Sequence, residues 1–185
     1  FSGVGLHKGQ KANLQITSDT PNAGITFIRT DLRDDNQIKA VWNNVSDTTL
    51  STTIKNNKGA SVSTIEHLMS ALSGMHIDNA KIYIDGPEVP IMDGSSKVFV
   101  ELIENAKIEE QNHKRNIIKV LKEVKVEKED SFVFLSPNNQ FSINFEIEFD
   151  SPFIKKQECR LQLLNGNYKT DISSARTFGF EKDVE

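Results

Sequence analysis

The stretch STIEHLMSALSGMHIDNAKIYIDG, residues 63–86, decides the fold of this chain, because a helical pattern in it is followed at once by a strand pattern. Ser63 and Glu66 have the spacing of a capping box, and Gly74 ends the periodic run. The apolar positions of that run recur at helical spacing: Ile65, Leu68, Met69 and Leu72. The pattern predicts a helix from Ser63 to Gly74 with Glu66 and His67 in its first turn.

Glu66 and His67 are the candidate catalytic residues of this stretch. Side chains on adjacent helical residues point about 100° apart, so both can line one cleft. The imidazole can then bind a metal ion while the carboxylate moves a proton, which is the division of labour of a metal-assisted hydrolase. The alternative is that Glu66 is only the capping acid and His67 only a partly exposed helix residue.

Strand patterns and a second helical pattern surround this helix. Ala80, Ile82 and Ile84 alternate with more polar residues, which predicts a half-buried strand. Further β-prone runs cover residues 11–17, 24–29, 38–42 and 48–54. The second helix follows a serine N-cap and carries Val98, Phe99, Leu102 and Ile103 at helical spacing. Strands with two such helices predict an α+β layer.

Three acidic residues, Asp85, Glu88 and Asp93, lie between the predicted strand and the second helix. They could be read as a carboxylate cluster for a metal ion. Their spacing, however, spans a strand end and a proline turn, so capping and turn roles are favoured for all three.

A polar segment, KIEEQNHK at residues 107–114, has no periodicity and is the predicted linker between two domains, residues 1–106 and 115–185. The second domain is strand-rich, with predicted strands at 117–121, 124–126, 132–135 and 141–149. The last of these alternates strictly and therefore has one apolar face, which needs a covering layer. No helical pattern of comparable strength follows, so this domain is expected to be incomplete.

The composition narrows the functional class. The net charge of −4 and the absence of a long basic run argue against a nucleic-acid binder. No apolar stretch approaches the roughly 18 residues that a membrane span needs. A single cysteine, Cys159, cannot form an internal disulfide, and a reducing cytoplasm fits this best.

Four motifs, taken together and in this order, resemble one enzyme family. They are GVGLH at 3–7, STIEHLMSALSGMHIDNA at 63–80, DGPEVPIMDGSS at 85–96 and SARTFGF at 174–180. The chain resembles the zinc-dependent UDP-3-O-acyl-N-acetylglucosamine deacetylases of bacterial lipid A biosynthesis. The resemblance implies an α+β fold in which a two-layer sheet and helix sandwich is duplicated in two domains, with the second domain truncated before its helices.

The resemblance also implies a reaction and roles for particular residues. The substrate is a UDP-linked acylated amino sugar, whose N-acetyl group is hydrolysed to acetate with Zn as the cofactor. His67 would be a zinc ligand, Glu66 the general base and Thr177 an oxyanion donor. The residues expected to contact substrate are Phe178, Leu50, Ser51 and His7. The remaining zinc ligands and the general acid belong to motifs that this sequence lacks, so the chain alone is expected to be inactive.

Two readings from other classes stay open. A non-catalytic binding or structural α+β module would need Glu66 and His67 only as a helix start, and zinc content would separate it from the enzyme. A small-molecule kinase is less favoured, because the glycine-rich segment GVGLHKG at 3–9 lacks the spacing of a phosphate-binding loop. Without the family resemblance, a tight turn before the strand at 11–17 is the favoured interpretation of this segment. The oligomeric state is not predicted.

Overall fold

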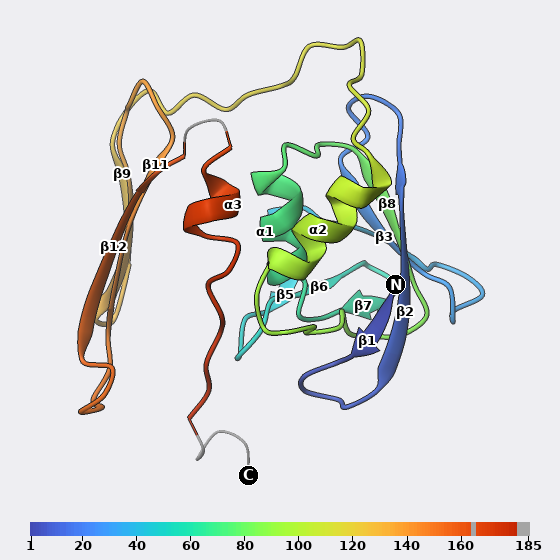
Figure 1. Ribbon diagram of the computed structural model, residues 1–185, viewed down its shortest axis with the longest axis horizontal. Helices are drawn as coiled ribbons and strands as arrows, with labels where there is room; N and C mark the ends of the chain where they lie inside the picture. The colour runs from blue at the N-terminus through green and yellow to red at the C-terminus, as the bar shows by residue number, and fades with distance from the viewer. Residues whose placement is uncertain (164–165, 181–185) are drawn as a thin grey trace. The chain divides into compact units, whose positions relative to one another are not determined.

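The computed structural model describes residues 1–163 and 166–180. The chain divides into two compact units (Figure 1), the first containing Phe1–Lys114 and Lys169–Glu185 and the second containing Arg115–Tyr168. The fold is α+β, as the sequence predicts, and the two units are described separately below.

The first unit is built on a five-stranded sheet with the order β1-β2-β8-β3-β4. The strands are β1 (Ser2–Val4), β2 (Lys11–Ser18), β8 (Ala80–Ile84), β3 (Ile25–Arg29) and β4 (Gln37–Lys39). All neighbours are antiparallel except β3 and β8, which run parallel. Ala80, Ile82 and Ile84 are buried while Lys81 and Tyr83 are half-buried, so the predicted alternation of β8 is confirmed.

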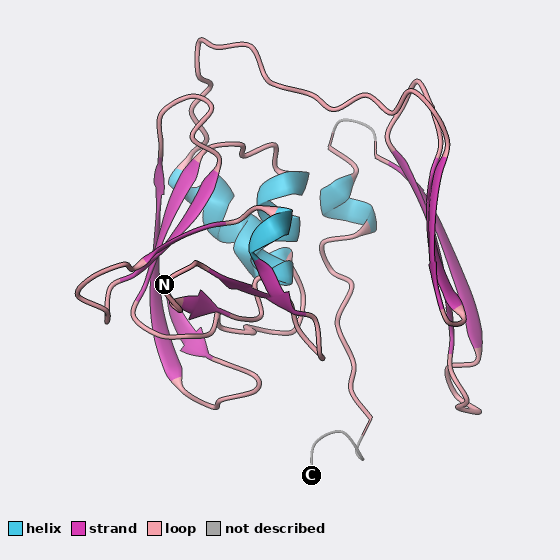
Figure 2. Cartoon of the chain, turned by 180° about the vertical axis from the view of Figure 1, so that it is seen from behind, coloured by secondary structure: helices cyan, strands magenta, loops and turns pink. Residues whose placement is uncertain are grey.

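Two helices, α1 (Glu66–Gly74) and α2 (Lys97–Ala106), cover one face of this sheet (Figure 2). Their buried side chains are Leu68, Ala71 and Leu72 of α1 and Phe99, Val100 and Ile103 of α2. They pack against an apolar sheet interior that includes Leu14, Phe27, Ile38, Ile82 and Ile84. Burial of each large side chain stabilises the fold by about 1.5–3 kcal/mol. The predicted two-layer sandwich is therefore present in the first unit.

A smaller antiparallel sheet in the same unit contains β5 (Val45–Asp47), β6 (Thr53–Lys55) and β7 (Ser61–Val62). Two sequence predictions fail here. The strand predicted over 38–42 ends at Lys39, and Trp42, which is 88% exposed, opens the 3₁₀ turn η1 (Trp42–Asn44). Most of the run 48–54 is a loop, in which Leu50 has a φ of 57° and cannot continue a strand.

The second unit consists of two antiparallel hairpins. They are formed by β9 (Val124–Lys128) with β10 (Ser131–Leu135) and by β11 (Ser142–Glu148) with β12 (Lys156–Gln162). The predicted strand at 117–121 is wrong, because these residues are irregular and expose Ile117, Ile118 and Leu121. The apolar side chains of the hairpins, among them Phe132, Phe141 and Phe145, are also exposed.

The boundary between the first and second units lies after Lys114, at the end of the predicted linker. The expected second domain ran to Glu185, whereas residues 169–180 group with the first unit. The physical reason is that this segment, which begins in the short helix α3 (Tyr168–Asp171), bonds to the first unit: Lys169 pairs with Glu104 of α2, and the Thr177 amide donates to the Gly94 carbonyl over 3.0 Å.

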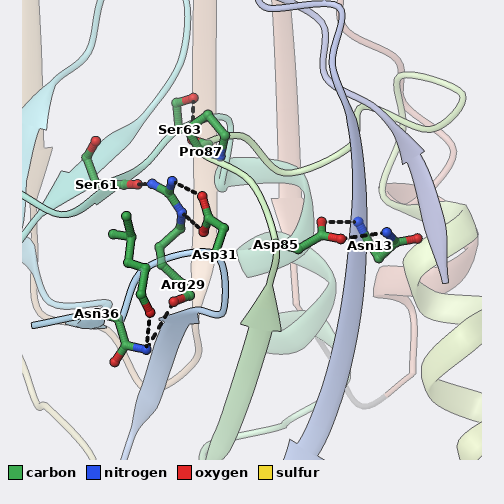
Figure 3. Close-up of polar contacts among 9 residues, drawn as sticks. Asn13, Arg29, Asp31, Asn36, Ser61, Ser63, Asp85 and Pro87 are labelled. Atoms are coloured by element: carbon green, nitrogen blue, oxygen red, sulfur yellow. Dashed lines mark hydrogen bonds and ion pairs between the residues drawn. The ribbon is translucent and has the colours of Figure 1, made fainter. Parts of the chain in front are cut away.

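One buried cation connects the main sheet to the smaller one. Arg29, at the end of β3, donates from Nε and Nη2 to the Asp31 carboxylate over 2.8 and 2.6 Å, and from Nη1 to the Ser61 carbonyl over 2.7 Å (Figure 3). Ser61 begins β7, which leads directly into the turn before α1. Arg29 therefore helps to place the start of that helix.

We expect Arg29→Met to lower the free energy of unfolding by about 2 kcal/mol, because the Ser61 carbonyl loses a charged donor. Arg29 holds the pKa of Asp31 below its usual range, so this pair stabilises the fold above the ordinary pKa of aspartate and ceases to do so as the pH falls through the lowered pKa. The difference between wild type and variant should shrink in acid. Urea titrations at several pH values measure it, and the exposed Arg33→Met is the matched control.

Candidate active site

The start of α1 does not have the predicted capping box. Glu66 is the first helical residue, Ile65 precedes it, and the helix has no side-chain cap. The Ser63 hydroxyl donates instead to the Pro87 carbonyl over 3.2 Å, and the Ser63 amide donates to the same carbonyl over 2.9 Å (Figure 3). Ser63 is thus held by the segment that follows β8, and its hydroxyl is not available to the helix.

The Glu66 carboxylate contacts the Thr52 amide with one oxygen and lies near the His67 imidazole with the other. Oε2 accepts the Thr52 amide over 2.9 Å, while Oε1 lies 4.0 Å from Nε2 of His67. The Glu66 side chain is 37% exposed and the His67 side chain 14% exposed. An acid and an imidazole therefore lie side by side at the helix start, with the carboxylate reachable by solvent, which is the arrangement that a proton transfer to or from water requires.

Leu50 and Ser51 lie in the loop before Thr52, whose amide bonds to Glu66. Besides the Thr52 amide bond to Glu66, the Ile65 amide donates to the Thr52 carbonyl over 3.4 Å. The Leu50 side chain is 67% exposed, and Ser51 is half-buried. The structure therefore brings this predicted wall segment next to Glu66 and leaves an apolar side chain there facing solvent.

Thr177 reaches the site through the loop before α2. The Thr177 amide donates to the carbonyl of Gly94, which lies in that loop, over 3.0 Å. Ser96, two residues after Gly94, donates from its hydroxyl to the His67 carbonyl over 3.0 Å. One short loop thus contacts both the first turn of α1 and the segment of Thr177. Phe178, the next residue, is 52% exposed and makes an edge-to-face contact with Phe180.

The loop of His7 is attached to the site through a buried acid. Glu88, which is 2% exposed, accepts the His7 amide at Oε1 and the Lys8 amide at Oε2, each over 2.9 Å. The same Oε1 accepts the Thr64 hydroxyl over 3.0 Å. The His7 side chain itself is exposed. The His7 backbone, and not its side chain, therefore connects this loop through Glu88 to the turn before Glu66.

The three acids that the sequence offered as an alternative metal cluster have separate structural partners. Asp85 accepts the amide and the side-chain amide of Asn13 over 2.7 and 2.6 Å (Figure 3), and these bonds lower its pKa. Asp93 accepts the hydroxyl and amide of Ser95, which likewise lower its pKa. The predicted turn role is confirmed for Asp93 alone, whereas Asp85 bonds to Asn13 of β2, 72 positions away, and Glu88 bonds to the backbone of the His7 loop.

The metal-binding capacity of the described part of the chain is small. Within residues 1–163 and 166–180, no three His, Cys, Asp or Glu side chains form a group that could hold a metal ion. His67 is a candidate ligand that lies beside a candidate base, Glu66. Catalytic zinc sites use three protein ligands, so the described residues fit a zinc site in part, as the source of one ligand.

Sequence reasoning missed two contributors to the site, Thr64 and Ser96. The sequence pattern gives Thr64 no role and predicts only a serine cap for the second helix, whereas the Ser96 hydroxyl donates to the His67 carbonyl and the adjacent Ser95 hydroxyl accepts the first amide of α2. Glu88 was assigned a structural role without a partner. No local pattern could have found these contacts, because each joins segments at least 24 residues apart.

No helix in the described part of the chain is long and apolar enough to cross a membrane.

Residues 1–185 match the family model described as LpxC: UDP-3-O-acyl N-acetylglycosamine deacetylase. A UDP-3-O-acyl-N-acetylglucosamine deacetylase of Syntrophus aciditrophicus is 47% identical over 98% of this chain and 58% of its own length. Proteins with the same name from Shewanella pealeana and Shewanella halifaxensis are 44% and 43% identical over all of this chain and 61% of their own lengths. The chain thus spans about three fifths of these curated relatives.

Proposed function

The chain belongs to the UDP-3-O-acyl N-acetylglycosamine deacetylase family, and from this premise we propose that it is the part of a deacetylase that supplies the base and one metal ligand. The proposed reaction is hydrolysis of the N-acetyl group of UDP-3-O-acyl-N-acetylglucosamine in lipid A biosynthesis. The products are the free amine and acetate. The proposed setting is the cytoplasm.

Glu66 is the proposed general base. The oxygen of a water molecule attacks the acetamide carbonyl, a C–O bond forms, and Glu66 accepts a proton from that water. The C–N bond then breaks, and the leaving nitrogen takes a proton from an acid that we place outside this chain. The observation that carries the proposal is the pair of Glu66 and His67, in which Oε2 is fixed by the Thr52 amide and Oε1 lies 4.0 Å from the imidazole.

The side-chain hydroxyl of Thr177 is the proposed donor to the oxyanion that forms on the carbonyl oxygen during attack. Such donors stabilise developing charge most when they are held in place before the reaction. The bond from the Thr177 amide to Gly94 supports this role, because the same loop contacts the first turn of α1 through Ser96. Phe178, Leu50, Ser51 and His7 are the proposed substrate contacts.

His67 is the proposed zinc ligand. When bound, zinc would supply Lewis-acid polarisation of the scissile carbonyl. The imidazole of His67 is mostly buried beside Glu66, and the Ser96 hydroxyl fixes the backbone at that residue. The other ligands are proposed to come from the rest of the protein, because the described residues hold no group of three.

Acetate release tests the function directly. The full-length protein is incubated with UDP-3-O-acyl-N-acetylglucosamine, and acetate and free amine are quantified together with the zinc content. Equal amounts of both products are expected, with dependence on zinc. A protein that binds the nucleotide sugar without releasing acetate would be a binding module, and the deacetylase proposal would be wrong.

We expect the 185-residue chain on its own to hold zinc weakly and to release no acetate, because one imidazole cannot replace the three protein ligands of a catalytic site. Equilibrium dialysis against zinc, with metal analysis of the protein fraction, measures this. The full-length protein is the positive control. One tightly held zinc ion per isolated chain would mean that the ligand assignment is wrong.

A further inference from the structure

Glu88 is a buried acid that connects two distant segments of the first unit. Only 2% of the residue is exposed, and its two carboxylate oxygens accept three hydrogen bonds, from the amides of His7 and Lys8 and from the Thr64 hydroxyl. Two of these bonds cross more than 79 positions of sequence. A buried carboxylate without donors would be costly, so the loop and the acid depend on one another.

Glu88 packs closely against the backbone of the His7 loop. A Cβ atom on Gly5 would lie 2.5 Å from Oε2 and 2.7 Å from Cδ of Glu88, so only glycine allows the backbone to approach this carboxylate so closely. The Gly5 amide and carbonyl also close the loop, through bonds with the Gln10 carbonyl over 2.9 Å and the Gly9 amide over 3.1 Å. The exposed His7 side chain is thus carried by a backbone that is fixed beneath it.

Glu88 also bonds to Thr64, which lies in a strained turn. Thr64 is 1% exposed and has a φ of 57°, in the left-handed region that β-branched residues avoid. Such a conformation persists only where the surroundings impose it. The Thr64 hydroxyl bond to Glu88 and the bonds of Ser63 to Pro87 impose it here. Two residues later the chain enters α1 at Glu66.

We infer that Glu88 is a positioning residue of this site: one buried carboxylate holds the His7 loop and the Thr64 turn together, and so sets His7 relative to Glu66 and His67. This inference rests on the proposed function for its catalytic consequence. Its structural content, the clamp on two backbone amides, does not, and can be tested separately.

Glu88→Gln is the informative substitution, because the amide has nearly the shape of the carboxylate but only one acceptor oxygen. All three partners of Glu88 are donors. In either orientation of the glutamine, its NH₂ group faces a backbone N–H of His7 or Lys8, and that donor loses its acceptor. The loop should therefore detach from the clamp while the core stays packed.

Hydrogen exchange tests the clamp in the full-length protein. In Glu88→Gln the amides of His7 and Lys8 should exchange at least about tenfold faster, while amides of β2 and β8 keep their wild-type rates. Gly5→Ala should produce the same local acceleration by displacing the carboxylate. The control is Asp85→Asn. Asp85 lies three residues before Glu88, and this change breaks an exposed bond with Asn13, so the exchange of the His7 and Lys8 amides should be unchanged. Unchanged exchange at His7 and Lys8 in Glu88→Gln would overturn the inference.

Kinetics of the same variants test positioning. Glu88→Gln should lower kcat/KM at least about tenfold, whereas in the background of His7→Ala it should lower kcat/KM by less than about twofold, because residues that act through one another are not additive. Equal effects in both backgrounds would show that Glu88 does not act through His7 and would overturn its positioning role. A wild-type protein without deacetylase activity would instead overturn the proposed function, and the clamp would be judged by exchange alone.

Discussion

Glu66→Gln is expected to lower the deacetylation rate of the full-length protein by at least about a hundredfold with little change in stability. Glutamine keeps an acceptor for the Thr52 amide, which bonds to Oε2 over 2.9 Å, but it cannot take a proton from water. Loss of a positioned general base typically costs 10²–10⁴-fold in rate, equivalent to about 3–5 kcal/mol of barrier. Steady-state acetate release, zinc content and melting temperature measured on one preparation separate these effects.

The matched control for this variant is Glu101→Gln on α2. Glu101 is exposed and its contact is a 3.9 Å pair with Lys97, four residues earlier, so the same chemical change there should leave the rate within about twofold. If Glu66→Gln keeps near-full turnover, Glu66 only holds the Thr52 loop and the base must be another residue.

His67→Ala is expected to lose at least about a thousandfold in rate, equivalent to about 4 kcal/mol, together with most of the bound zinc. The reason is that a catalytic zinc site with two remaining protein ligands binds the metal poorly. The Ser96 hydroxyl bonds to the backbone carbonyl of His67, not to its side chain, so the start of the helix should survive. Metal analysis after gel filtration, and far-UV circular dichroism, measure the two outcomes.

His113→Ala in the linker is the control for this second variant, because it removes an exposed histidine far along the chain from the candidate site. It should keep both zinc and activity. A His67→Ala protein that retains one zinc ion per chain would show that the metal is held elsewhere, and a zinc-free wild type with full activity would remove zinc from the proposal altogether.

The sequence alone was sufficient for the elements whose signal is local. The period of Ile65, Leu68 and Leu72 predicted α1, and the alternation of Ala80, Ile82 and Ile84 predicted β8, because both reflect which side chains a single element buries. The motifs around Glu66 were long enough to indicate the family. The adjacency of Glu66 and His67 is also a property of the sequence, so the candidate acid and imidazole needed no tertiary information.

The partners of these residues were decided only by the tertiary structure. The spacing of Ser63 and Glu66 predicted a capping box, but Ser63 bonds to Pro87 and Glu66 bonds to Thr52. A capping hydroxyl competes with any acceptor that the fold brings within reach, and local spacing cannot reveal that competitor. The extended runs at 38–42 and 48–54 failed for a related reason, since turns with residues such as Leu50 at positive φ interrupt β-prone sequence.

Glu88 and Thr177 show the same limit at longer range. Glu88 is separated from His7 by 81 positions, and Arg176, the neighbour of Thr177, is separated from its acceptor on Asp93 by 83. Composition and period carry no information about which distant backbone a buried carboxylate or a returning segment will meet. The sequence therefore determined which residues could do chemistry, and the fold determined which of them lie close together, because hydrogen bonds between distant segments depend on how the whole chain packs and not on local spacing.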